Sequence, residues 1–329
     1  MKPISRALRT IRDAEQLLAP YFKPTRMVEA SNLAKQKGSH AGIYLKLETD
    51  LPTASFKPRG ALYALATTLG RRPVAEVIAS STGNHGAAVA WAARTLGIPA
   101  TIFLPSHPNP VKRQRIADLG ARIIEVGGED LADAFLRAEE YSTRAGVYFL
   151  NDATDRDLPA GPATIGVEIL RQLPEAQAIY IPMGDTALVR GIGTAVRELN
   201  PGIKIIGVQA ERAPSYYLSW RAGRPVPTDS CDTCADGLAT RTPDARNVDE
   251  IRELVHDVLL VSEDEMLHAI GLLYDRARVL AEPAGAAATA AYLKASASSV
   301  TPTPGPVVLL VTGANITPST RQRAGLPPD

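Results

Sequence analysis

A lysine at the start of a helix is the first residue of this sequence that could do covalent chemistry. Lys57 stands in the run Ser55-Phe56-Lys57-Pro58-Arg59-Gly60-Ala61. Because Pro58 disfavours the α conformation for the residue before it and suits the first helical position, the sequence predicts that Lys57 lies at a junction between a strand and a helix, outside the α region. A primary amine fixed there is a candidate Schiff-base nucleophile, with a pKa that burial would lower. The alternative is a solvated lysine at a helix start.

Two runs of small residues follow predicted strands and open predicted helices. The first is Ser80-Ser81-Thr82-Gly83-Asn84-His85-Gly86, and the second is Ile179-Tyr180-Ile181-Pro182-Met183-Gly184-Asp185-Thr186-Ala187-Leu188. The N-terminus of a helix presents unpaired N–H groups and partial positive charge, which suit an anion. We therefore expect the first run to bind a carboxylate and the second a phosphate. Taken singly, each run is also typical of an ordinary helix cap.

Motifs for nucleotide binding or zinc chemistry are missing from the sequence. No GxGxxG follows a strand, and neither GxxxxGK[ST] nor HExxH occurs. Cys231 and Cys234 form a C-x-x-C pair, but two thiolates supply only half of a tetrahedral zinc site. We interpret these cysteines as buried or incidental thiols.

The elements that must position these residues alternate along the chain. Residues 1–19 read as an amphipathic helix. Strands are predicted at Ile43–Leu47, Val77–Ala79, Thr101–Leu104, Arg122–Val126, Ile179–Pro182, Ile203–Val208, Val258–Val261 and Val307–Val311. Helices are predicted at Ala61–Leu69, Gly86–Leu96, Pro110–Leu119, Leu131–Arg144, Pro162–Leu173, Leu188–Leu199, Glu263–Val279 and Gly285–Ala295. This alternation predicts parallel sheets covered on both faces, hence an α/β fold.

Two local features complete the predicted organisation. Just past predicted helices, where a left-handed residue is favoured, stand Gly70, Gly97, Gly120 and Gly146. The region Arg212–Asn247 is rich in proline, aspartate and arginine, and we expect it to be a long excursion from the sheet.

Composition excludes several classes of partner. The chain has 329 residues with 36 basic and 35 acidic side chains, a balance that argues against nucleic-acid binding or a polybasic membrane surface. No run of 18 apolar residues occurs, so we expect no membrane span. The presence of only two cysteines fits a cytoplasmic protein.

Taken together, these runs resemble the fold-type II pyridoxal-phosphate enzymes, in particular the branch of threonine/serine dehydratases and serine racemases. The matching order is S-F-K-x-R-G-A, S-x-G-N-H, a glycine-containing loop after a strand, Ala235–Ala239, Glu282–Ala286 and Leu310–Asn315. The resemblance covers nearly the whole chain. It implies the tryptophan synthase β-like fold, with two three-layer α/β/α domains and mainly parallel sheets. Residues 1–60 and 151–329 would form the large domain that binds pyridoxal 5′-phosphate, and residues 61–150 the small mobile domain.

The resemblance also implies a role for individual residues. Lys57 would form the Schiff base and later remove the Cα proton. Asn84 would bind the 3′-oxygen of the cofactor, and Thr312 would meet its pyridine nitrogen. The cofactor-binding set is Phe56, Lys57, Asn84, Gly184, Asp185, Thr186, Ala187, Leu188 and Thr312, and the set around the substrate carboxylate is Ser81, Thr82, Gly83 and His85. Because a hydroxyl at Thr312 cannot act as a permanent anion, we expect prompt loss of a β-substituent over a long-lived carbanion.

The implied activity is that of a dehydratase, or ammonia-lyase. It would eliminate water from a β-hydroxy-α-amino acid of the threonine/serine type and release a 2-oxo acid and ammonia. Family members carry A-G-Q-G-T where this chain has Ala160–Thr164, so a bulkier substrate such as 3-phenylserine stays open. Where the racemase branch has metal-binding carboxylates, this chain has Gln209 and Ser215, so we expect no metal.

The phosphate loop departs from the family pattern and motivates the alternatives. The run of glycines usual in the family is replaced by Gly184-Asp185-Thr186-Ala187, so we expect Asp185 to point away from phosphate or to pair with Arg190. A pyridoxal-phosphate-binding protein without turnover therefore stays open. So does a racemase that uses Thr82 on the second face, and a β-replacement transferase of the cysteine-synthase type, although such transferases usually carry threonine in place of His85. Homodimers are common in the family.

Overall fold

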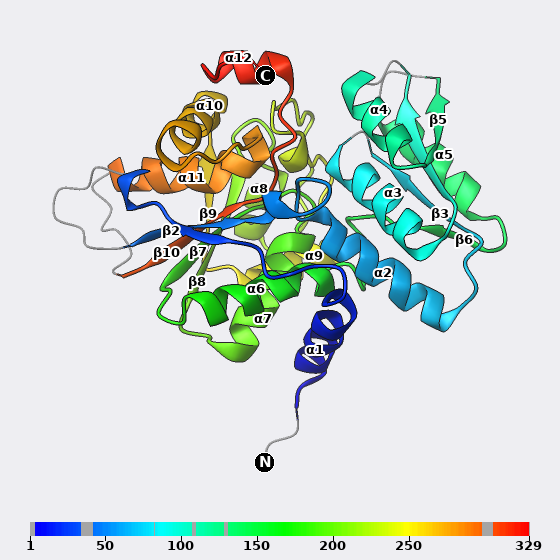
Figure 1. The fold of residues 1–329 in the computed structure, drawn as a ribbon, viewed down its shortest axis with the longest axis horizontal. Helices are drawn as coiled ribbons and strands as arrows, with labels where there is room; N and C mark the ends of the chain where they lie inside the picture. The colour runs from blue at the N-terminus through cyan, green and yellow to red at the C-terminus, as the bar shows by residue number, and fades with distance from the viewer. Residues whose placement is uncertain are drawn as a thin grey trace.

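Two sheets flanked by helices make up the described part of the chain, residues 4–33, 42–81, 83–106, 110–127, 131–297 and 305–328 of a computed structural model. The larger sheet has six strands in the order β1 (Met27–Glu29), β2 (Ile43–Leu47), β10 (Val307–Val311), β7 (Ala178–Pro182), β8 (Lys204–Ala210) and β9 (Asp257–Val261). The smaller has four, in the order β5 (Arg122–Val126), β4 (Ala100–Pro105), β3 (Glu76–Ser80) and β6 (Val147–Phe149). Figure 1 shows the two sheets in separate lobes.

Nearly all strand pairs are parallel, as expected for an α/β fold. In the larger sheet only β1 runs antiparallel to its neighbour β2. The four strands of the smaller sheet are parallel throughout. The central strand β10 is buried at every position, and its sequence Val-Val-Leu-Leu-Val is the continuous apolar run of a strand covered on both faces. Parallel pairing places the carboxyl ends of these strands together, where ligand sites of such sheets lie.

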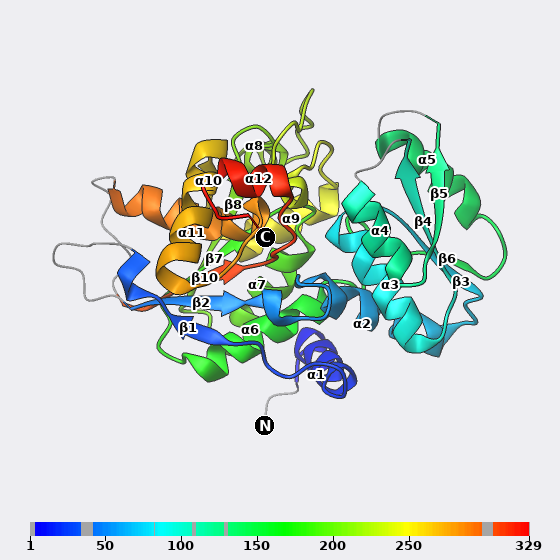
Figure 2. The ribbon, with the colours of Figure 1, turned by 45° about the horizontal axis from the view of Figure 1, so that its top comes forward.

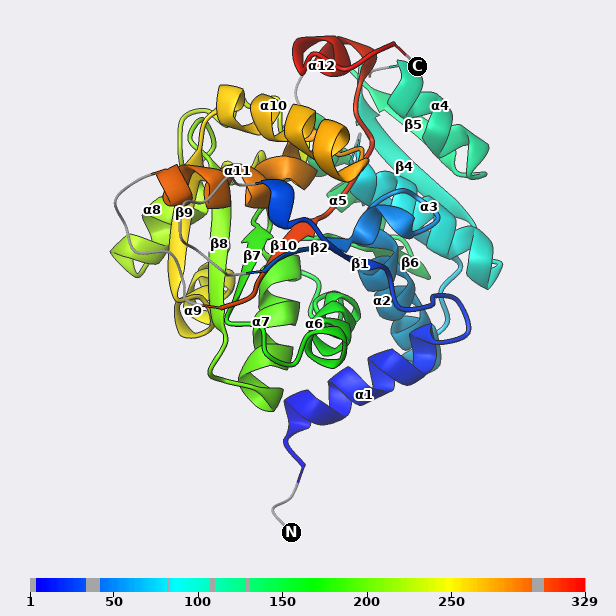
Figure 3. The ribbon, with the colours of Figure 1, turned by 60° about the vertical axis from the view of Figure 1, so that its left-hand side comes forward.

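Helices cover both faces of the larger sheet (Figure 3). On one side lie α10 (Glu263–Leu272) and α11 (Pro283–Ala297), of which α11 packs against β7, β8, β9 and β10. On the other side α6 (Ala160–Gln172) and α7 (Ala187–Leu199) pack on each other, with the N-terminal α1 (Arg6–Leu18) against them. No helix of the described residues is long and apolar enough to cross a membrane.

The smaller sheet carries its own helices (Figure 2). These are α3 (Asn84–Leu96), α4 (Pro110–Asp118) and α5 (Leu131–Ser142). Helix α2 (Lys57–Arg71) packs against both α3 and α6, so it joins the two lobes. All strands of the smaller sheet fall between residues 76 and 149. The division into a large cofactor domain and a small mobile one stays a prediction.

The predicted strands all occur, with ends shifted by at most two residues. The sequence did not indicate β1 and β6, each only three residues long. It also missed α8 (Ser215–Ala222), α9 (Ala245–Leu254) and α12 (Pro318–Arg323). The region Arg212–Asn247 is therefore not one irregular excursion, because it contains α8 and the start of α9.

Left-handed glycines occur at three of the four predicted positions, and two of these follow a helix end. Gly97 and Gly120 have φ of 70° and 87° and lie within two residues of the ends of α3 and α4. Gly146 has φ 79° but lies four residues past the end of α5. The prediction is wrong for Gly70, which lies inside α2; this helix continues to Arg71 and ends at an extended Arg72. The long predicted helix Glu263–Val279 is also interrupted, because α10 passes into a π-helical turn at Leu273–Ala277.

Candidate active site

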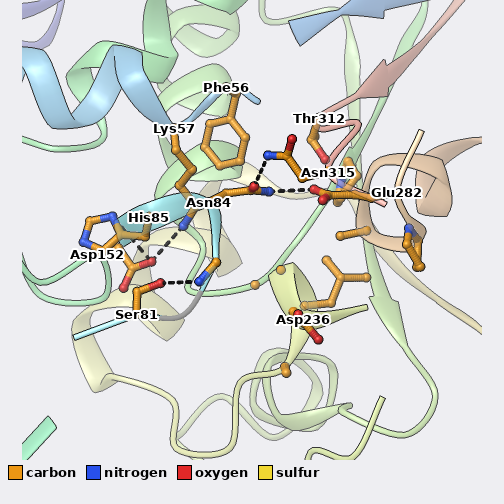
Figure 4. A pocket seen from close by; sticks show the side chains of 18 of the residues that line it. Phe56, Lys57, Ser81, Asn84, His85, Asp152, Asp236, Glu282, Thr312 and Asn315 are labelled. Carbon is orange, nitrogen blue, oxygen red and sulfur yellow. Dashed lines mark hydrogen bonds and ion pairs between the residues drawn. The ribbon is translucent and has the colours of Figure 1, made fainter. Parts of the chain in front are cut away.

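A cavity of about 520 Å³ lies where segments of the two lobes meet, within the size range of small-molecule sites. Several of its residues come directly after strands: Ser81 after β3, Asp152 after β6, Gly184 after β7 and Thr312 after β10. Figure 4 shows that Lys57, Asn84, Asp152, Glu282 and Thr312 converge on this cavity. The cavity also takes residues from α4 and from the turn at Asp236–Leu238.

Lys57 is the first residue of α2, so the prediction that it lies outside the α region is wrong. Phe56, the N-cap, already has helical angles, with φ −66° and ψ −20°. Pro58 is compatible with this geometry because N–H groups of the first turn need no intrahelical acceptor. The Phe56 N–H instead donates to the carbonyl of Thr312 at 3.0 Å, which ties the start of α2 to the end of β10.

The Lys57 ammonium is paired with Asp152. Its Nζ atom lies 2.7 Å from Asp152 Oδ2 and 5.4 Å from the centre of the Phe56 ring. Burial disfavours the charged amine, but Asp152, with smaller contributions from Asp185 and Glu282, raises the pKa of Lys57 above its usual value. The expectation of a lowered pKa is therefore wrong, because no sequence motif marked this carboxylate.

Behind Lys57, a buried network of charges fixes the first turn of α2. Arg59 donates to Glu48 at 2.8 Å and to Glu168 at 2.6 Å, and its side chain is 2% exposed. Lys46 donates to the same Glu168 at 2.6 Å, and Thr25 donates to Glu48 at 2.7 Å. Buried charges in such a network must all be paired, so α2 has little freedom to rotate or slide. The network thereby positions Lys57.

The start of α3 brings most of the predicted carboxylate residues to the cavity. Ser81, Gly83, Asn84 and His85 all line it, and Thr82 lies outside the described residues. His85 is buried, its Nε2 atom lies 2.8 Å from the Leu150 carbonyl, and burial lowers the pKa of its ring. A neutral His85 that donates through Nε2 has no second ring N–H, so only its backbone N–H is left for a carboxylate.

Asn84 is held by two polar partners on the opposite wall. Its Nδ2 atom donates to Glu282 Oε1 at 2.6 Å, and its Oδ1 atom accepts from Asn315 (Figure 4). Gly313 leaves room for this contact, because a Cβ there would lie 2.2 Å from Glu282 Oε1. Glu282 is buried, and burial raises the pKa of its carboxyl. These contacts fix the Asn84 amide at the centre of the cavity.

The loop before α7 presents the predicted phosphate-binding residues. Gly184 through Leu188 all line the cavity. A Cβ at Gly184 would lie 2.2 Å from the Gly237 carbonyl oxygen, so the loop needs glycine there to pack on its neighbour. Thr186, the residue before α7, has φ 69° and therefore adopts the left-handed conformation. That conformation turns the chain into the helix, whose first N–H groups have no intrahelical partners.

Asp185 does not pair with Arg190 as expected. Arg190 donates to Glu250 at 3.0 Å and to the Thr186 hydroxyl at 3.1 Å. Asp185 instead accepts a hydrogen bond from the Thr240 hydroxyl at 3.2 Å and lines the cavity. Burial, with the nearby Asp152 carboxylate, raises the pKa of Asp185 to about 6.

The residues present fit pyridoxal phosphate. The cavity holds a lysine amine for an aldehyde carbon, a fixed amide at Asn84, a hydroxyl at Thr312 and the N-terminus of α7 for a phosphate. The close packing of Gly184 on Gly237 forms a cradle beside that N-terminus, which any side chain would fill. Nearby, Arg190 Nη2 is buried without a hydrogen-bond partner among the described residues and adds positive charge to α7.

Sequence reasoning missed several groups of the cavity. Asp152 belongs to no recognisable motif, and the strand before it, β6, is too short to be predicted from the sequence. Lys112 and Arg115 reach the cavity from α4, where Lys112 pairs with Asp236 and Arg115 donates to Asn315 and to the Thr53 carbonyl. Glu282, Asp236 and Asn315 stand in runs that the family resemblance marked, but no role was assigned to them.

At the two positions where this chain lacks the metal-binding carboxylates of the racemase branch, the side chains have hydrogen-bond partners within the protein. Gln209 Oε1 accepts from the Tyr217 N–H at 2.8 Å, and the Ser215 hydroxyl donates to the Thr240 carbonyl at 2.6 Å. Among the described residues, no group of three or more histidine, cysteine, aspartate or glutamate side chains is arranged to hold a metal ion. Independence from metal stays a prediction.

Comparisons with known proteins agree with this site. The model of a family described as pyridoxal-phosphate dependent enzyme matches residues 18–313. An L-threonine ammonia-lyase of Geobacter sulfurreducens is 36% identical over 307 residues, which cover 93% of this chain and 75% of that one. Threonine deaminase isoform 2 of Solanum lycopersicum has a similar structure, with a TM-score of 0.90, 28% identity and coverage of 97% and 92%. Maize serine racemase has a TM-score of 0.89, 27% identity and coverage of 96% of each chain.

Proposed function

This chain belongs to the family of pyridoxal-phosphate-dependent enzymes, and we propose that it is an ammonia-lyase that removes water from a β-hydroxy-α-amino acid. The products are a 2-oxo acid and ammonia. One observation carries the proposal: the amine of Lys57 projects into the cavity onto which the N-termini of α3 and α7 open. That arrangement provides one covalent anchor and two separate sites for anions.

The cofactor and the protein contribute different parts of the chemistry. When bound, pyridoxal phosphate supplies the electron sink that makes the Cα–H bond of an amino acid acidic. Lys57 would hold the cofactor through its amine, and the same amine would take the Cα proton of the substrate. Asp152 keeps the lysine side chain in the cavity, and the charge network around Arg59 keeps the start of α2 in place.

The two helix N-termini are assigned to different anions. At α7, the backbone of Gly184 through Leu188 binds the phosphate of the cofactor. At α3, Ser81 and the N–H groups of Gly83, Asn84 and His85 bind the substrate carboxylate. Two separate anion sites in one cavity would hold the substrate at its carboxylate and the cofactor at its phosphate, so the Cα–H bond would be oriented before proton transfer.

Thr312 presents a hydroxyl to the cavity, where it would meet the ring nitrogen of the cofactor. A hydroxyl would not keep that nitrogen protonated as an aspartate would, so the ring would take up less of the negative charge that develops at Cα, and loss of the β-hydroxyl would relieve that charge. This chemistry favours elimination over racemisation. Water is excluded when the lobe of α3 and α4 closes on the cavity.

The proposal is tested by release of a 2-oxo acid and ammonia. The panel is serine, threonine, 3-phenylserine and 3-hydroxyaspartate, each in its separate stereoisomers and without added thiol. Release from at least one of them supports the proposal. Product formation only when a thiol nucleophile is present would point to a β-replacement transferase, and inversion at Cα without 2-oxo acid would point to a racemase.

A further inference from the structure

Asp185 is the residue that most sets this cavity apart from the family pattern, and it faces the reacting groups. It stands in the loop before α7, where dehydratases and racemases usually carry glycine, and its side chain lines the cavity. Its carboxyl has one hydrogen bond among the described residues, from the Thr240 hydroxyl to Oδ1 at 3.2 Å. The second oxygen, Oδ2, is therefore available to a bound molecule.

Five elements place charged or polar groups around Asp185. Asp152, after β6, and Lys57, at the start of α2, both act on its charge. Arg190, one turn into α7, favours the ionised form. Tyr216 of α8 interacts with it electrostatically, and Asn247 of α9 donates to the Asp185 carbonyl at 3.4 Å. The negative Asp152 and the burial of the loop outweigh the positive groups.

Asp152 and Asp185 consequently have pKa values shifted in opposite directions. Burial disfavours the ionised form of Asp152, but the neighbouring His85 and Lys57 lower its pKa below the usual range. Asp185 has its pKa raised to about 6, and a phosphate bound at the same loop would raise it further. Two carboxyl groups whose surroundings separate their pKa values in this way are typical of an acid and an ionised partner in one site.

We propose that Asp185 is the general acid that protonates the leaving β-hydroxyl group. This inference rests on the proposed function and adds to it the proton donor. Lys57 takes the proton from Cα, and the Cα–Cβ double bond forms with that electron pair. The Cβ–O bond breaks, its electrons stay on oxygen, and the Asp185 proton completes a water molecule. Asp185 is left as a carboxylate and regains its proton from solvent after the product leaves.

The geometry allows this transfer. The leaving oxygen is only two bonds from Cα, so its proton donor must lie near the base that takes the Cα proton. Asp152 is in direct contact with Lys57 at 2.7 Å, and Asp185 interacts electrostatically with both residues. Among the carboxyl groups of the described lining, Asp152 is paired with Lys57, Asp236 is paired with Lys112, and Glu282 accepts from Asn84. Asp185 is the carboxyl left to approach the β-substituent.

The test compares leaving groups that do and do not need a proton. Chloride departs without protonation, whereas hydroxide does not. The variant Asp185→Asn is compared with wild type on the best hydroxyamino acid of the panel and on 3-chloroalanine. We expect kcat for the hydroxy substrate to fall by ~100-fold or more, while 3-chloroalanine is turned over at nearly the wild-type rate. The control Asp264→Asn, an exposed aspartate on α10, should leave both rates unchanged.

Equal losses on both substrates would overturn the inference and indicate that Asp185 serves folding or phosphate binding. A wild-type enzyme that releases 2-oxo acid from no hydroxyamino acid would overturn the proposed function as well, so the two failures are distinguishable.

A second measurement does not depend on turnover. In holoenzyme labelled with ¹³C at aspartate carboxyl carbons, the resonance missing from Asp185→Asn should titrate at about pH 6 or above. Titration near the ordinary value of 3.8 would show that the folded protein does not raise the pKa of Asp185 and would overturn its role as an acid.

Discussion

The Nζ atom of Lys57 lies 2.7 Å from Asp152 Oδ2, so the nucleophile of this cavity is paired with a carboxylate that follows a strand of the smaller sheet. Lys57 begins α2, and Asp152 follows β6, 95 residues later in the chain. The pair keeps the amine charged and directed into the cavity. Only a neutral amine attacks a carbonyl carbon. Asp152 therefore affects the rate at which Lys57 binds the cofactor as well as the position of the amine.

Replacing Asp152 therefore changes the pH dependence of cofactor attachment. In Asp152→Asn the pKa of Lys57 should fall, because its charge is no longer stabilised while burial still opposes it. The visible absorbance of the lysine-bound cofactor should then develop faster than in wild type at neutral pH. Stopped-flow mixing of cofactor-free protein with pyridoxal phosphate measures this rate. An unchanged rate–pH profile would mean that Asp152 does not govern the charge of Lys57.

The buried network around Arg59 should dominate the local stability of α2. Arg59→Met leaves Glu48 and Glu168 buried with only Lys46 to neutralise them, so we expect a loss of ~3–5 kcal/mol in the free energy of unfolding. Urea denaturation followed by circular dichroism measures the change. The control is Arg71→Ala, which removes a surface pair with Asp157 and should shift stability by ~1 kcal/mol or less. Similar losses in the two variants would contradict a special role for the buried network.

The raised pKa of Asp185 also predicts how the free energy of unfolding depends on pH. Its carboxyl binds a proton more tightly in the folded protein, with a pKa of about 6 against the ordinary 3.8. Between these values the native state holds more protons than the unfolded state, so Asp185 makes the wild type less stable as pH rises through this window. Relative to Asp185→Asn, the free energy of unfolding of wild type should fall between about pH 4 and pH 6 and then level off. Parallel curves for the two proteins would refute the raised pKa.

Gly184 should be required for the phosphate loop. A Cβ in Gly184→Ala would lie 2.2 Å from the Gly237 backbone, which has no flexible end that could move away. The loop before α7 must then shift, and we expect weaker binding of pyridoxal phosphate, measured by fluorescence titration. The matched control is Gly70→Ala, where a Cβ would meet no atom within 4 Å inside α2. Comparable loss of affinity in both variants would contradict the role of the loop.

Metal chelation should leave the reaction unaffected. Gln209 and Ser215 replace the carboxylates of the racemase branch, and both side chains already have partners in the protein. We expect the same kcat/KM with EDTA and with added magnesium or calcium. Loss of activity in EDTA that returns with either ion would contradict this expectation.

The sequence predicted the architecture well because the buried strands are continuous apolar runs. Val307–Val311 was located to the residue, since a parallel strand covered on both faces has no polar interruption. Ile43–Leu47 was also located to the residue, although it contains the buried Lys46. The edge strand β1 and the short β6 offer only three residues each, too few for a pattern. Helix α8 was missed because its sequence, Ser-Tyr-Tyr-Leu-Ser-Trp-Arg-Ala, lies in a region rich in proline and aspartate.

Within the site, motifs identified residues but not their electrostatics. Lys57, Asn84 and Gly184 were found because each stands in a local run with family resemblance. Asp152 could not be found in this way, since its significance comes from β6 pairing beside β3 and bringing the loop after it to Lys57. The pKa values of Lys57 and Asp185 depend on that contact. Long-range pairing of charges is therefore what the sequence pattern left out.

The central claim is that pyridoxal phosphate is bound covalently through Lys57. Borohydride reduction of the holoenzyme, followed by peptide mass spectrometry, tests it most directly. We predict a single phosphopyridoxyl adduct on Lys57, and loss of both the adduct and the visible absorption band in Lys57→Ala. An adduct on another lysine, or a holoenzyme whose visible band survives in Lys57→Ala, would contradict the account.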